Sequence, residues 1–151
     1  MAIFEEQFTI AAPPETVWEL LLDPERLRPC IPACEDLRVE DDRTWRLRLT
    51  VKVGFLSTTQ NVRVTIIEAD RPRRLVSIGH GLDMRLGSRT EMTNALDLTP
   101  LGPDATQVRY RSEVKVLGPL GSVGDGVMKA KVKQMAAEFA SRVRAAVEGR
   151  A

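Results

Sequence analysis

The sequence predicts an α+β fold in which a curved antiparallel sheet of about seven strands wraps around a long C-terminal helix. Three observations predict it: a first strand followed by two short helices, a run of about six strands joined by short turns, and a final helix with one apolar stripe. Strands joined by short turns pair antiparallel, and one sheet of that size twists and curls. Its apolar concave face would cover the stripe. At 151 residues the chain is a single domain, residues 1–151.

The final helix is expected to run from Pro119 to Glu148. Pro119 suits a first helical turn, and Gly149 stands where a helix commonly stops. Several glycines, among them Gly121 and Gly124, weaken its first turns by ~1 kcal/mol each, so this start could act as a gate over a cavity. Apolar side chains recur at steps of three and four residues, which places them on one face. They are Val123, Val127, Met128, Val132, Met135, Phe139, Val143 and Val147.

The N-terminal region predicts one strand and two short helices. Polar and apolar residues alternate over Ala2–Ile10, which is typical of a half-buried strand. Two prolines end it, and Glu15–Leu22 carries apolar residues at helical spacing. Asp23-Pro24 restarts the chain as a second short helix through Leu27, and a strand follows near Asp36 to Val39. Two helices joined this tightly form a V.

Five longer strands follow. The clearest pattern has Trp45, Leu47, Leu49, Val51 and Val53 on one face, with polar residues between them. Gly54, Asp70-Arg71-Pro72 and the segment 100–104 supply turns, and Gly87 marks a turn or a bulge. The expected strands are Arg43–Val53, Leu56–Ala69, Val76–Met84, Leu86–Leu98 and Thr106–Leu117.

The inward strand faces contain more polar groups than a simple core. His80 shares a phase with Met84, as Ser88 and Asn94 do with Met92. A buried polar group without a partner costs ~1–3 kcal/mol, so these groups are paired, wet or facing a ligand. One interpretation is an apolar cavity with a few polar groups, and the other is a bulge that turns several of them outward. The cavity interpretation predicts these ligand-binding residues: Trp45, Gln60, His80, Met84, Ser88, Met92, Asn94, Tyr110, Met128, Met135 and Phe139.

Composition excludes several classes of function. The 22 basic and 21 acidic residues leave a net charge of +1, which gives no nucleic-acid footprint. No apolar run reaches the ~18 residues that span a bilayer, and the N-terminus lacks a signal core, so we expect a cytoplasmic protein. Two cysteines and one histidine cannot build a four-ligand zinc site, and no catalytic residue, metal or cofactor is predicted. Cys30 and Cys34 are interpreted as buried thiols, since a redox role would need a depressed thiol pKa.

Four segments together resemble a known family. They are Phe8-Thr9-Ile10-Ala11-Ala12-Pro13-Pro14-Glu15-Thr16-Val17-Trp18, residues 23–35 with Cys-Ile-Pro-Ala-Cys-Glu, Lys-Val-Gly at 52–54, and Lys-Gln-Met-Ala-Ala-Glu-Phe at 133–139. This pattern is similar to the CoxG-like family of carbon monoxide dehydrogenase subunits, within the START-like, or SRPBCC (Bet v 1-like), superfamily. Ala33 stands where the family pattern has glycine. The sequence ends at Ala151, without the extended tail through which longer members are expected to attach to a membrane.

The resemblance implies the helix-grip fold with a hydrophobic cavity. It also implies a non-catalytic, accessory role beside a carbon monoxide dehydrogenase-type molybdenum hydroxylase, with a peripheral contact at the inner face of the membrane. The leading hypothesis is therefore a protein that holds a lipid or quinone-like molecule between the sheet and the C-terminal helix. One alternative is a polyketide cyclase or hydrolase in which His80 or Tyr110 moves protons. Another is an interaction module with a filled core.

Overall fold

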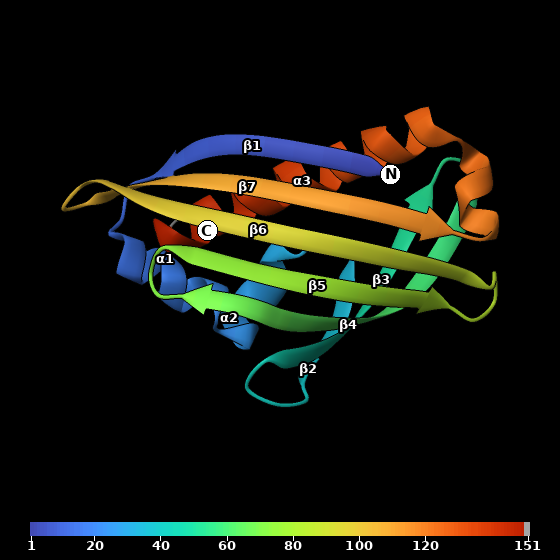
Figure 1. Cartoon of the computed structure of the whole chain (residues 1–151), viewed down its shortest axis with the longest axis horizontal. Coiled ribbons are helices and arrows are strands. Elements are labelled where there is room, and N and C mark those ends of the chain that lie inside the picture. The colour runs from blue at the N-terminus through green and yellow to red at the C-terminus, as the bar shows by residue number, and fades with distance from the viewer. Residues whose placement is uncertain (150–151) are drawn as a thin grey trace.

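The computed structural model describes residues 1–149 and confirms the expected α+β architecture. Seven antiparallel strands form one sheet in the order β1-β7-β6-β5-β4-β3-β2, and a long helix, α3, crosses behind it (Figure 1). Two short helices follow the first strand, as predicted. The elements are β1 (Ala2–Ile10), α1 (Pro14–Leu21), α2 (Pro24–Leu27), the 3-10 turn η1 (Arg28–Cys30), β2 (Cys34–Val39), β3 (Thr44–Val53), β4 (Leu56–Asp70), β5 (Arg74–Asp83), β6 (Ser88–Gly102), β7 (Ala105–Leu117), the 3-10 turn η2 (Pro119–Val123) and α3 (Asp125–Val147).

The two ends of the sheet are closed differently. Helices α1 and α2 lie at one end, and η2 with the β3–β4 and β5–β6 turns lies at the other (Figure 1). At the α1 end, Val17, Trp18 and Leu20 are at most 2% exposed and pack with Ile10 of β1. Asp23 caps α2, because its carboxylate accepts from two backbone N–H groups of the first turn. This end is a solid core.

Helix α3 is shorter than the predicted helix from Pro119 to Glu148. Gly118 and Gly124 have φ values of +93° and +97°, which side-chain-bearing residues rarely adopt, so the chain forms η2 before α3 begins. The fully buried residues of α3 are Ala136, Ala140 and Val143, in its C-terminal half. No helix among residues 1–149 is long and apolar enough to cross a membrane.

The predicted phase of β5 is wrong, whereas the phases of β3, β4, β6 and β7 match the prediction. His80 and Met84 are exposed, while Gly79, Gly81 and Asp83 are buried on the inner face. The two glycines supply no side chain to mark that face, so the apolar alternation follows the outer residues instead. The outcome is the bulge-type alternative left open by the sequence, and it removes His80 from the interior.

Candidate functional site

A cavity of about 280 Å³ lies between the concave face of the sheet and α3. Its walls are mostly apolar and come from every strand between β3 and β7, from α3, and from the α1 to β2 region. The void shows that the interior is not filled by side chains. Eight of the eleven predicted residues line it: Trp45, Gln60, Met92, Asn94, Tyr110, Met128, Met135 and Phe139. Their part in ligand binding remains a prediction.

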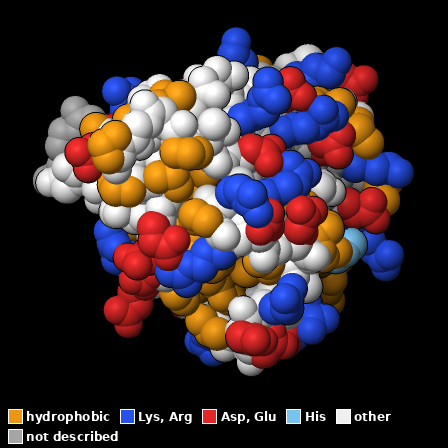
Figure 2. Space-filling model, turned by 60° about the vertical axis from the view of Figure 1, so that its left-hand side comes forward, with side chains coloured by type: hydrophobic (Ala, Val, Ile, Leu, Met, Phe, Trp, Pro, Cys, Tyr) orange, Lys and Arg blue, Asp and Glu red, His pale blue; other side chains and the backbone are white. Residues whose placement is uncertain are grey.

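The other three predicted residues lie elsewhere. His80 and Met84 are exposed, and the pale blue histidine side chain is visible at the surface in Figure 2. Ser88 is buried, but its hydroxyl oxygen accepts a hydrogen bond from the N–H of Leu120 at 2.8 Å. Ser88 therefore holds η2 against the start of β6 instead of lining the cavity.

A chain of hydrogen bonds orients Gln60 at the cavity wall. The buried carboxylate of Asp83 accepts from the hydroxyl of Thr58 at 2.6 Å, from the N–H of Thr59, and from two N–H groups of the following turn. These bonds, led by that of Thr58, lower the pKa of Asp83 against the opposing effect of desolvation. The hydroxyl of Thr58 has given its proton to Asp83, so it accepts from Nε2 of Gln60 at 2.8 Å.

Two glycines of β5 leave room for the side chains that cross the sheet. A Cβ on Gly81 would lie 2.7 Å from Oε1 of Gln60, and a Cβ on Gly79 would lie 2.6 Å from Cγ of Met92. Oε1 of Gln60 is buried and has no hydrogen-bond partner among residues 1–149. Gln60 and Met92 therefore lie flat on the glycine backbone, and this keeps the space above them open.

A second polar group on the wall combines Asn94, Tyr110 and Ser112. Oδ1 of Asn94 accepts from the hydroxyls of Ser112 at 2.9 Å and Tyr110 at 3.4 Å. Within residues 1–149, Nδ2 of Asn94 has no protein partner, so it remains a free donor. Burial raises the pKa of Tyr110 to about 12, opposed by its hydrogen bond with Ser112. Tyr110 is therefore a protonated donor at neutral pH and not a base.

The sequence prediction missed two cations of the lining, Arg43 and Lys131. Lys131 is half-buried, and its Nζ donates to Oε1 of Gln134 at 3.3 Å. Neither cation forms an ion pair in the described part of the chain, and the cavity lining contains no Asp or Glu. Spacing could have identified Lys131, since it follows Met128 by three residues and precedes Met135 by four, which places it on the stripe.

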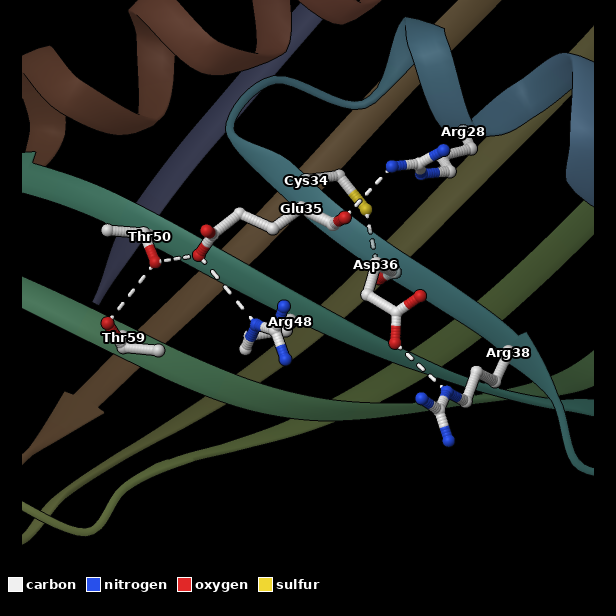
Figure 3. A network of polar contacts seen from close by, with 8 residues as sticks. All are labelled: Arg28, Cys34, Glu35, Asp36, Arg38, Arg48, Thr50 and Thr59. Atoms are coloured by element: carbon white, nitrogen blue, oxygen red, sulfur yellow. Dashed lines mark hydrogen bonds and ion pairs between the residues drawn. The ribbon is translucent and has the colours of Figure 1, made fainter.

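The Cys-Ile-Pro-Ala-Cys-Glu segment fixes another part of the wall. Figure 3 shows Arg28, Glu35 and Thr50 converging where η1 meets the edge strand β2. The guanidinium of Arg28 donates to the carbonyl of Glu35 at 2.9 Å, and the carboxylate of Glu35 accepts from the hydroxyl of Thr50 on β3. These contacts hold the intervening Ile31 and Pro32, which line the cavity.

The cysteines of this segment are free thiols. Burial raises the pKa of Cys30 and of Cys34, which disfavours the thiolate that redox chemistry needs. Residues 1–149 contain no group of three or more His, Cys, Asp or Glu that could hold a metal ion. What the site offers is an apolar space with a few hydrogen-bond donors.

Comparison with solved structures defines the class of fold. A conserved protein from Geobacillus kaustophilus superposes with a TM-score of 0.87 at 18% identity, covering 97% of this chain and 95% of that one. The Zhui aromatase/cyclase from a Streptomyces species gives 0.70 at 19% identity, covering 97% and 93%. A START superfamily protein from Mycobacterium smegmatis gives 0.67 at 19% identity, covering 99% and 96%. The chain therefore has the START-like, helix-grip fold.

The family is narrower than the fold. The sequence pattern of the carbon monoxide dehydrogenase subunits called CoxG matches residues 7–148. The chain belongs to this CoxG family, which confirms the resemblance seen in its motifs. No curated protein matches it.

Proposed function

We propose that this protein binds a hydrophobic small molecule, lipid-like or quinone-like, in the cavity between the sheet and α3. The observation that carries the proposal is the cavity itself, with apolar walls, unused donors and no carboxylate. Its volume of about 280 Å³ is close to the lower end of the ~300–1,000 Å³ typical of small-molecule sites. That space suits a ring system or part of an acyl chain.

The free polar groups favour a ligand whose polar end accepts hydrogen bonds. Nδ2 of Asn94 and Nζ of Lys131 are donors, and Arg43 adds a second positive charge. Tyr110 and Phe139 provide an aromatic wall, with ring centroids 5.4 Å apart. A quinone combines a flat apolar ring with carbonyl acceptors, and it matches these features better than a ligand that has only donors.

Membership in the family supports the accessory part of the proposal. A molybdenum hydroxylase of the carbon monoxide dehydrogenase type is the proposed partner, in the cytoplasm, with a peripheral contact at the inner face of the membrane. In this role the bound molecule would serve the partner enzyme and would not be changed by this chain.

The cyclase or hydrolase alternative loses the two residues that it invoked. His80 lies on the outer face, out of reach of the cavity, and the raised pKa of Tyr110 prevents it from acting as a base near neutral pH. The likeness to an aromatase/cyclase extends to the fold alone. A binding role needs neither residue.

Solvent extraction of natively purified protein, followed by mass spectrometry, tests the proposal. We expect a stoichiometric isoprenoid or acyl compound from the wild type and from Asn61→Phe, which adds a ring on the exposed face of β4. Val62→Phe adds the same ring inside the cavity and should lose the compound. Folded wild-type protein that neither carries a compound nor binds a short-chain benzoquinone in titration would overturn the proposal.

A further inference from the structure

Apolar side chains gather at the end of the molecule away from α1. Phe55 and Met84 are 75% and 77% exposed, and Leu117 and Val127 are also exposed. They come from four places in the sequence: the β3–β4 turn, the β5–β6 turn, the end of β7 and the first turn of α3. We call these four residues the apolar tip.

Direct contacts tie these segments together. A Cβ on Gly54 would lie 3.2 Å from Cγ1 of Val127, which places the β3–β4 turn against α3. The guanidinium of Arg85 donates to the carbonyl of Ser57 at 2.6 Å, and this bond joins the β5–β6 turn to β4. A Cβ on Gly118 would lie 2.9 Å from the carbonyl oxygen of Gly87, so the end of β7 meets the same turn. The apolar tip is therefore one surface, at the η2 end of Figure 1.

The charges around the apolar tip are mostly positive. None of the five cations forms an ion pair with the described residues, whereas ten arginines elsewhere do. The exposed acids nearby are Asp125 and Glu91, and Asp83 is buried. On the face in Figure 2, by contrast, blue and red side chains are intermixed. The cations are Lys52, Arg85, Arg89, Lys115 and Lys129.

We propose that the apolar tip docks onto an anionic lipid bilayer. Separate turns that project apolar side chains inside a ring of unpaired cations fit an interface between acyl chains and acidic headgroups. Each basic residue near such a surface contributes about 1 kcal/mol, and each buried apolar side chain about 1.5–3 kcal/mol. A protein partner would be expected to leave a groove or an acidic counterpart to match, and the tip is convex and basic.

The same end carries one wall of the cavity. Val53, Leu120 and Met128 line it directly behind the apolar tip. Docking would therefore bring the glycine-rich segment around η2 to the lipid surface, and exchange of a hydrophobic ligand there rests on the proposed function. Docking itself needs no ligand, so the two proposals fail separately.

Vesicle co-sedimentation of the full chain tests the inference. We expect binding to vesicles of equimolar phosphatidylcholine and phosphatidylglycerol, weaker binding to phosphatidylcholine alone, and release by added salt. The double variant Phe55→Ser/Met84→Ser should bind at least about tenfold more weakly. The matched control, Val39→Ser/Ile67→Ser, removes side chains that are 55% and 53% exposed elsewhere and should bind like the wild type.

Two results would overturn the docking. One is a wild-type protein that ignores both vesicle compositions, and the other is equal binding by the tip variant and the control. A dimer that Phe55→Ser breaks, together with no vesicle binding, would assign the surface to a second copy of the chain. Extraction of the tip variant should still yield the bound compound, which separates loss of docking from loss of the cavity.

Discussion

The two ends of the sheet use the same kind of residues and reach opposite results. At the α1 end, Trp18 and its neighbours fill the space under β6 and β7, and α3 packs closely through Ala136, Ala140 and Val143. At the η2 end, the buried cluster contains only Val51, Val53 and Leu120, and α3 presents half-buried methionines across a void. Small residues let α3 approach one end, and long flexible ones hold it off at the other.

The largest expected effect comes from breaking the solid end. Trp18→Ala should cost about 3–5 kcal/mol of unfolding free energy, because Trp18 is 2% exposed and its neighbours cannot collapse into the gap. Met128→Ala, at the hollow end, should cost about 1 kcal/mol, since Met128 already borders empty space. Urea unfolding followed by circular dichroism measures both. Equal losses would show that the two ends are equally packed.

Asp83 is the next largest contributor that can be isolated. Its carboxylate accepts four hydrogen bonds, so Asp83→Asn should cost about 1–3 kcal/mol at neutral pH. The pKa of Asp83 is lowered in the folded state, so its contribution is present above the unfolded pKa of about 3.9 and is lost as pH falls through the folded value.

Unfolding midpoints measured from pH 7 downward test this. The wild type should lose stability more steeply than Asp83→Asn as pH falls below about 4. Asp42→Asn, in the exposed β2–β3 turn, should follow the wild type at every pH. Parallel curves for the wild type and Asp83→Asn would contradict the role given to Asp83.

A pair of glycine substitutions sharpens the contrast within the hollow end. Gly81→Ala would push against Gln60, which is held by Thr58, and should cost about 1–3 kcal/mol. Gly79→Ala would push against Met92, whose flexible side chain can move into the cavity, so its cost should be smaller. Thermal unfolding of the two variants compares them directly, and a larger cost for Gly79→Ala would mean that the space beside Met92 is not free.

Sequence reasoning predicted the architecture because β3, β4, β6 and β7 alternate strongly and α3 carries a long apolar stripe. It misplaced β5, since Gly79 and Gly81 mark the inner face by the absence of a side chain, and His80 was placed inside on the strength of its outer neighbours. It joined η2 to α3 because a positive φ at Gly124 is a backbone property that spacing does not show. The cavity itself depends on how far α3 stands from the sheet, which no single residue specifies.

Lys131 gives the smallest expected effect on stability and the clearest effect on binding. It has no ion pair within residues 1–149, so Lys131→Met should leave the unfolding free energy nearly unchanged. A charge-assisted hydrogen bond to a ligand carbonyl is worth about 1.5–3 kcal/mol, so the same variant should bind a short-chain benzoquinone about tenfold more weakly or worse. Lys133→Met removes an exposed charge from the same helix and should bind like the wild type. Equal weakening by both variants would point to the overall charge of α3, and a loss confined to Lys131 would place the polar end of the ligand at the hollow end of the sheet.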